Sequence, residues 1–185
     1  MINDVLDAAE KKMIKAGEVM AHDLGSLRTG RASPGLVENI KVDYYGTPTP
    51  LNQVASISAP EVRLLIIQPW DKQAIPAIEK ALQKSDLGLN PANDGTVLRL
   101  MIPQLTEERR KDLVKLVKKR VEEGRIAIRN VRREALEKLR EMQKSKEISE
   151  DDQKRAEKDL QDLTDKYVEK ASQMGKDKEQ EVLET

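Results

Sequence analysis

The chain of 185 residues has no cysteine, no phenylalanine and a single histidine, and only 2% of its residues are aromatic. Without cysteine there can be no disulfide framework, no thiolate metal site and no cysteine nucleophile, which fits a reducing compartment. The lone histidine, His22, has no second histidine with which to build a metal or triad site, so we expect it on the surface or partly packed. These absences exclude metal sites and catalytic sites that need cysteine or more than one histidine.

Other signatures are missing as well. The sequence contains no glycine-rich phosphate loop and no His-Glu-x-x-His pattern. Acidic pairs such as Asp151 and Asp152 are typical of a solvated helix surface in a chain that is 36% charged. No apolar run approaches the roughly 18 residues that span a bilayer, and the N-terminus does not resemble a signal peptide. We therefore predict a cytoplasmic protein that is no enzyme, needs no cofactor or metal, and does not enter a membrane.

The longest regular pattern covers residues 106–146 and predicts one uninterrupted helix. Apolar residues recur there every three or four positions, within a sector of roughly 80° at about 100° per residue. The members of this stripe are Leu113, Val117, Val121, Gly124, Ile128, Val131, Ala135, Leu139 and Met142. Thr106 can cap the start of the helix, and Glu107 and Glu108 place negative charge in its first turn.

The same helix carries cations on a second stripe, formed by Lys118, Arg125, Arg129 and Arg132, with Arg133 beside it. Residues 106–147 hold 15 Lys and Arg against 9 Asp and Glu, although the whole chain is neutral. One interpretation is that these arginines pair with nearby carboxylates and contribute little. The other is that they bind a localised anion such as an RNA backbone, since arginine contacts phosphate with two donors. The scarcity of aromatic residues favours recognition of RNA backbone and shape over base stacking.

Two further amphipathic helices flank this one, at residues 3–28 and from Ser149 onward. Three apolar stripes can bury one another, so we predict an antiparallel three-helix bundle. Between the helices, residues 30–105 show strand patterns at 37–45, 51–58, 62–68 and 96–102, a turn at 46–50, and a short helix at 74–84. This block is predicted to be a small mixed domain that contains Trp70 in its core, with one of Tyr44 and Tyr45 pointing outward. The predicted domains are residues 1–29 with 106–185, and residues 30–105.

Six sequence blocks, in order along nearly the whole chain, closely resemble the ribosome recycling factor family. They are Arg28-Thr29-Gly30-Arg31-Ala32, Tyr44-Tyr45-Gly46-Thr47-Pro48-Thr49-Pro50-Leu51, Ser85-Asp86-Leu87-Gly88-Leu89-Asn90-Pro91, Leu105-Thr106-Glu107-Glu108-Arg109-Arg110-Lys111, Arg129-Asn130-Val131-Arg132-Arg133 and Lys146-Glu147-Ile148-Ser149-Glu150-Asp151-Asp152. The resemblance implies an α+β, L-shaped molecule of tRNA-like dimensions, in which a long three-helix bundle carries an inserted β/α/β domain on a hinge.

The resemblance also implies a function and its partners. A monomer would bind the post-termination ribosome, chiefly through large-subunit ribosomal RNA, and would split it with elongation factor G and GTP hydrolysis by that factor. The family's RNA-contacting arginines fall on Arg129, Arg132 and Arg133, with Arg28 and Arg31 near the joint; the stripe pattern adds Arg125. The hinge would lie near residues 29–34 and 102–106, and its candidate residues are Thr29, Gly30, Arg31, Pro103, Gln104 and Leu105. The alternative is a helical scaffold that binds only protein partners.

Overall fold

The computed structural model describes residues 1–85, 87 and 89–184. It divides into two compact units, each described here by itself: Met1–Gly25 with Lys111–Gln180, and Ser26–Arg110 with residues 181–184 of the C-terminal end. The predicted α+β class, with a helical bundle and an inserted small domain, is confirmed. Asp86 and Gly88, which belong to one of the six sequence blocks, lie outside the described residues.

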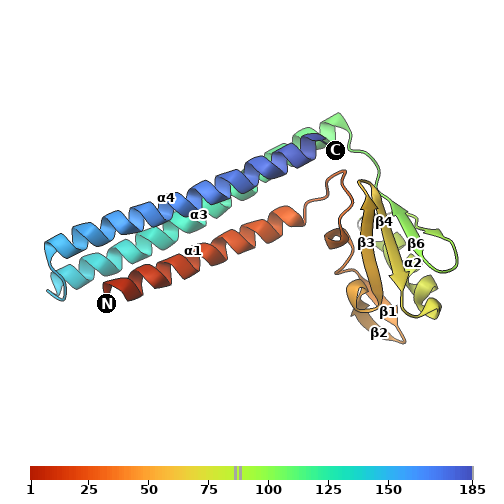
Figure 1. Ribbon diagram of the computed structural model, residues 1–185, viewed down its shortest axis with the longest axis horizontal. Coiled ribbons are helices and arrows are strands. Elements are labelled where there is room, and N and C mark those ends of the chain that lie inside the picture. Colours follow the sequence, from red (N-terminus) through yellow and green to blue (C-terminus); the bar gives the residue numbers. More distant parts are fainter. Residues whose placement is uncertain (86, 88, 185) are drawn as a thin grey trace. The chain divides into compact units, whose positions relative to one another are not determined.

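The first unit is a bundle that contains α1 (Ile2–Gly25) and most of α3 (Glu107–Lys144) and α4 (Glu150–Glu184), three helices that lie side by side in Figure 1. At about 1.5 Å per residue, the 38 residues of α3 extend about 57 Å. The apolar stripe of α3 forms its packing face, since every predicted member is buried except Val131 and Met142, which are half-buried. His22 is exposed, and α1 ends at Gly25, earlier than the sequence pattern indicated.

The two long helices begin and end on local signals. Thr106 caps α3, because its Oγ1 accepts a hydrogen bond of 3.1 Å from the N–H of Arg109. Ser149 caps α4 through a bond of 3.0 Å from the N–H of Asp152. At the end of α3, Lys146 adopts a φ of +63°, and the N–H groups of Lys146 and Glu147 bond to the carbonyls of Gln143 and Met142. This is a Schellman motif in which a lysine takes the place usually held by glycine.

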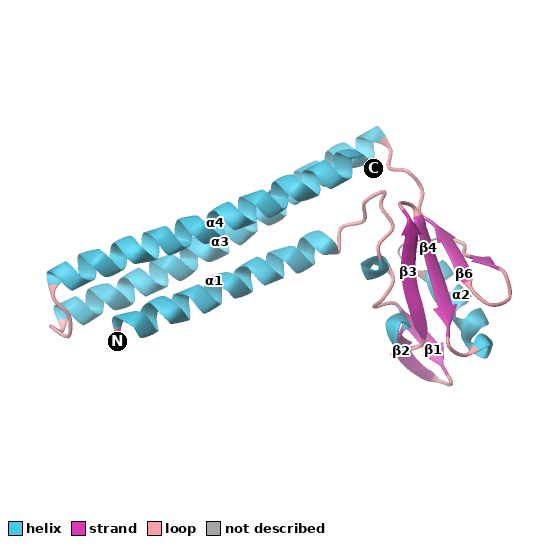
Figure 2. Cartoon of the chain, viewed as in Figure 1, coloured by secondary structure: helices cyan, strands magenta, loops and turns pink. Residues whose placement is uncertain are grey.

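The second unit contains a hairpin and a four-stranded antiparallel sheet. The hairpin joins β1 (Lys41–Tyr44) to β2 (Thr47–Pro50). The sheet has the order β3-β4-β6-β5, from Ala55–Glu61, Leu64–Pro69, Leu98–Met101 and Ala92–Asn93. The helix α2 (Ile75–Lys84) lies against one face of this sheet (Figure 2). Leu65, Ile67, Leu98 and Leu100 point from the strands into the core that α2 covers.

The predicted turn at residues 46–50 is wrong. The turn is the pair Tyr45 and Gly46, both with positive φ, and residues 47–50 form strand β2. Positive φ at both central residues is typical of a type I′ hairpin turn. Pro48 and Pro50 are tolerated because they alternate with threonines, at positions whose N–H would point away from β1 in an antiparallel pair.

The prediction that Trp70 belongs to the core is also wrong, because 68% of this residue is exposed. Ile67 and Pro69 are buried, and side chains alternate along a strand, so Trp70 points to the opposite face. No described helix covers that face. Tyr44 is half-buried and Tyr45 is 72% exposed, as the alternation predicted.

Candidate nucleic-acid interface

Four of the predicted RNA-binding residues lie together on the exposed side of α3. Arg125, Arg129, Arg132 and Arg133 fall within three turns of the helix, and we call them the arginine stripe. The helix holds its shape there because Gly124, Ile128 and Ala135 on its packed side are buried in the bundle. The stripe is therefore displayed on a rigid support, and it needs no ordering before it meets a ligand.

One carboxylate lies between two members of the stripe. Oε2 of Glu122 is 3.3 Å from Nη1 of Arg125, and Oε1 of Glu122 is 3.6 Å from Nη1 of Arg129. The side chains of Glu122 and Arg129 are about half exposed, so each of these pairs contributes at most about 1 kcal/mol. Such weak pairs leave both guanidinium groups available to an anion.

The other two arginines of the stripe have no carboxylate partner among the described residues. Nη1 of Arg132 donates to the amide oxygen of Gln161 on α4 at 3.4 Å, a neutral acceptor that leaves its charge uncompensated. Arg133 is exposed. Within the described part of the chain, Glu122 is thus the one carboxylate that forms ion pairs with the four arginines of the stripe. Surface ion pairing therefore explains only Arg125 and Arg129.

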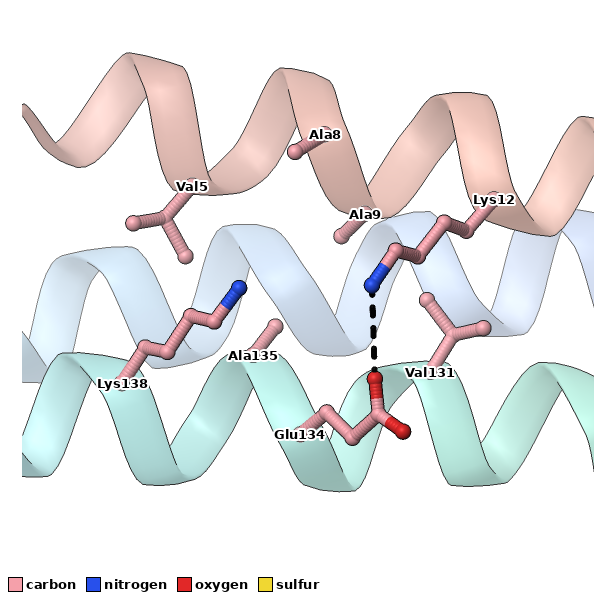
Figure 3. A pocket seen from close by; sticks show the side chains of 8 residues that line it. All are labelled: Val5, Ala8, Ala9, Lys12, Val131, Glu134, Ala135 and Lys138. Atoms are coloured by element: carbon pink, nitrogen blue, oxygen red, sulfur yellow. Dashed lines mark hydrogen bonds and ion pairs between the residues drawn. The ribbon is translucent and has the colours of Figure 1, made fainter.

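Glu134, a second acid in the same sequence segment, is turned toward α1. Its Oε2 lies 3.4 Å from Nζ of Lys12, and Figure 3 shows this pair between Val131 and Ala135 at the seam between α1 and α3. The gap at that seam has a volume of about 10 Å³, which is no more than the space of a single water molecule. Glu134 therefore closes the packed side of α3 and does not neutralise the stripe.

Arg28 and Arg31 belong to the second unit, and are described apart from the stripe. Arg28 is half-buried and borders a hollow of about 620 Å³ together with Arg109. Arg31 is exposed, and its backbone N–H donates to Oγ1 of Thr29 at 3.3 Å. Both residues lie near the start of the second unit, and their contact with RNA stays a prediction.

The candidate hinge residues show two different environments. Thr29 and Gly30 are buried, and the N–H of Ala32 bonds to the carbonyl of Val62, so this connection is tied to the sheet of the second unit. Pro103 and Gln104 are exposed and lie between β6 and α3, outside regular secondary structure. The next residue toward the sheet, Ile102, is anchored by a bond of 2.8 Å from its N–H to the carbonyl of Arg63.

The described residues contain no group of three or more metal-binding side chains. In the same part of the chain, no helix is long and apolar enough to cross a membrane. Sequence reasoning named Arg125 as a candidate contact but missed the surroundings of its side chain. Nε of Arg125 is buried and has no hydrogen-bond partner. Arg125 also lines a groove together with residues of α4, which approaches α3 closely at Gly175, and periodicity along α3 alone could not reveal this contact.

Comparison with known proteins places the chain in a family. The sequence model of the ribosome recycling factor family matches residues 20–183. Ribosome-recycling factors of Halothermothrix orenii and Thermomicrobium roseum are 58% and 55% identical to this chain over 184 residues, and the matches cover 100% of both chains in each case.

Solved structures agree with this assignment. A solution structure of the ribosome recycling factor has 47% sequence identity and a TM-score of 0.78, with 100% of this chain and 98% of that chain covered. A second structure has 51% identity, a TM-score of 0.70 and 99% coverage of each chain. It presents models for the T. thermophilus ribosome recycling factor and the E. coli elongation factor G bound to the E. coli post-termination complex. The chain belongs to the ribosome recycling factor family.

Proposed function

We propose that this chain binds the ribosome after termination and, with elongation factor G and GTP, separates the subunits so that mRNA and tRNA are released. Two independent observations support the proposal. Relatives that share more than half of its residues over their full length are ribosome-recycling factors. The structure supplies a suitable surface for RNA, because the arginine stripe displays four guanidinium groups, and among the described residues Glu122 is the one acid that forms an ion pair with them.

The arginine stripe is the observation that carries the RNA-binding part of the proposal. Guanidinium groups bind phosphate with two parallel N–H donors, and they stay charged at every physiological pH. The described unit that bears the stripe has one aromatic side chain, Tyr167, and this residue is buried. Binding is therefore expected to read the backbone and shape of folded ribosomal RNA, chiefly that of the large subunit, and not single-stranded bases.

The second unit is proposed to work as a lever for elongation factor G. Two chain connections join it to the bundle, and the proposed hinge comprises Thr29, Gly30 and Arg31 on one connection and Pro103, Gln104 and Leu105 on the other. GTP hydrolysis by elongation factor G would push the second unit while the arginine stripe holds RNA. The resulting strain would act on the contacts between the ribosomal subunits. The chain itself would perform no catalysis, need no cofactor, and act as a monomer in the cytoplasm.

Co-sedimentation with vacant ribosomes and with isolated large subunits tests the proposal directly. We expect the chain to pellet with both, and to convert post-termination complexes into subunits only when elongation factor G and GTP are present. A folded chain that binds no ribosome would overturn the proposal and favour a scaffold that uses protein partners alone. Binding without splitting would retain the RNA contact and reject the lever.

A further inference from the structure

A second cationic surface lies on the first unit, in a groove between α3 and α4 with a volume of about 370 Å³. Its walls carry Lys118 and Arg125 from α3, and Ser172 and Lys176 from α4. Lys118 lies on the same face of α3 as Arg125, a member of the arginine stripe, because the seven residues that separate them are close to two helical turns. The groove therefore continues the stripe toward the N-terminal end of α3.

The groove exists because two helices approach closely at a residue without a side chain. A Cβ atom on Gly175 would lie 2.6 Å from Cγ2 of Val121, so only glycine permits this separation of α3 and α4. Val121 and Gly175 form the floor, and Ser172 one turn earlier is small as well. The longer side chains of Lys118, Arg125 and Lys176 stand around this hollow.

The polar groups of the groove are those expected of an anion site. Nε of Arg125 is buried without a hydrogen-bond partner, while Nη1 of the same guanidinium contacts Glu122. A buried N–H without an acceptor is unfavourable. A ligand can reach the remaining part of this side chain, which is 33% exposed. Lys118 and Lys176 are exposed and form no ion pair within the described part of the chain.

Two acids, Glu122 and Glu179, also border the groove. Glu122 is already shared by Arg125 and Arg129, so its charge is divided between two guanidinium groups. Three cations, Lys118, Arg125 and Lys176, therefore stand against two acids, which leaves the groove with a net charge of +1. This surplus of positive charge favours an anion, such as a single phosphodiester, over a cationic ligand.

We infer that this groove binds one phosphate of the ribosomal RNA backbone, with Arg125, Lys118 and Lys176 as its contacts and Ser172 as an additional donor. The inference rests on the proposed function and extends the RNA-binding surface from Arg125, which the groove shares with the arginine stripe, to Lys118 and Lys176. From Lys118 to Arg132 the helix rises about 21 Å at 1.5 Å per residue. A surface of this length can follow several consecutive phosphates of one strand.

The test compares two variants of equal charge in the full-length chain. Lys118→Ala with Lys176→Ala removes two cations from the groove. The control, Lys11→Ala with Lys15→Ala, removes two cations from the outer side of α1, because each lies two residues from the buried Met13 and two residues rotate a helix by about 200°. Affinity for isolated large subunits is measured across a salt series for each variant.

We expect the groove variant to bind about 10-fold more weakly, with a salt slope that is smaller by about one, while the control stays close to the unsubstituted chain. An unchanged slope in the groove variant overturns the inference, as does an equal loss in the control, which would show an effect of net charge alone. If the unsubstituted chain binds no ribosome, the proposed function fails. If it binds, and Arg129→Ala with Arg132→Ala loses affinity while the groove variant does not, only the groove is rejected.

A second measurement does not depend on a variant. The Nε–H resonance of Arg125 is followed by NMR while a short RNA duplex is added to the unsubstituted chain. We expect it to shift together with the amides of Ser172 and Gly175. If the resonances of the arginine stripe move and these do not, RNA binds without entering the groove and the inference is wrong.

Discussion

Glu122 is the residue whose charge most directly opposes RNA binding by the stripe. Its two carboxylate oxygens contact Arg125 and Arg129 at 3.3 and 3.6 Å, and half of its side chain is exposed. A phosphate that approaches these arginines meets a like charge beside them. The carboxylate therefore weakens the field of the stripe while it holds the two side chains near each other.

We predict that Glu122→Gln strengthens ribosome binding by about 3-fold at low salt. An exposed pair is worth up to about 1 kcal/mol, and 1.4 kcal/mol corresponds to a factor of ten. Equilibrium binding to large subunits measures the change, with Glu123→Gln as a control, since Glu123 pairs with Arg120 and not with the stripe. Weaker binding by Glu122→Gln would show that Glu122 mainly positions the arginines.

The stability of one turn in the second unit depends on the ionisation of Asp94, and therefore on pH. Its Oδ1 accepts hydrogen bonds from the N–H groups of Val97 and Thr96 at 2.9 and 3.0 Å, and these bonds hold the pKa of Asp94 below its ordinary value of 3.8. The carboxylate form thus stabilises the folded turn. This stability is present above pH 3.8 and is lost as the pH falls through the lowered pKa.

We predict that acid denaturation of the second unit includes a contribution from Asp94. The carboxyl resonance of Asp94 should titrate below those of unperturbed aspartates in an NMR pH series. Asp94→Asn should remove this part of the pH dependence, because the amide oxygen still accepts a hydrogen bond but no longer titrates there. Titration of Asp94 at its ordinary value would contradict the role of these bonds.

At the scale of helices, two glycines differ in the space that a side chain would have. Gly175 on α4 faces Val121 with no room for a Cβ, whereas a Cβ on Gly17 of α1 would meet nothing within 4 Å. Valine cannot retreat easily, because its branched side chain is restricted at χ1. The same substitution should therefore have opposite effects at the two positions.

We predict that Gly17→Ala stabilises the bundle by about 0.5–1 kcal/mol, through the better helix propensity of alanine. Gly175→Ala should destabilise it by about 1–2 kcal/mol, because overpacking outweighs that gain. Urea denaturation followed by circular dichroism compares the two variants. Stabilisation by Gly175→Ala would show that α3 and α4 can move apart without a loss of stability. It would contradict the explanation that the groove depends on glycine at position 175.

The helices were more predictable than the strands for a physical reason. The stripe on α3 repeats over 38 residues, and the caps at Thr106 and Ser149 have clear chemical signatures. The second unit instead depends on short strands whose pairing is decided by distant residues. Residues 47–50 resemble a turn by composition, and only pairing with β1 makes them a strand.

The same distinction applies to the candidate site, where some residues could be predicted from the sequence and others could not. The arginine stripe could be predicted because it lies on a single helix, where spacing along the sequence determines the face. Trp70 and the groove at Arg125 could not, since the first depends on which face of the sheet α2 covers and the second on the approach of α4. Contacts between elements decide both cases.

For the whole molecule, the lever requires that the two units can move relative to each other on the ribosome. The chain has no cysteine, so one cysteine introduced at an exposed position of each unit gives a single specific cross-link. We predict that a short bifunctional cross-linker abolishes subunit splitting while ribosome binding is retained. The singly substituted chains, treated alike, should split ribosomes normally, and undiminished splitting by the cross-linked chain would reject the lever.

The central claim is that the arginine stripe holds ribosomal RNA. The most direct measurement is the affinity of Arg129→Ala with Arg132→Ala for large subunits across a salt series, beside the charge-matched Lys11→Ala with Lys15→Ala. We predict at least a 10-fold loss and a salt slope smaller by about two for the arginine variant alone, since each phosphate contact contributes about one to the slope. A folded arginine variant with unchanged affinity and slope would contradict the account.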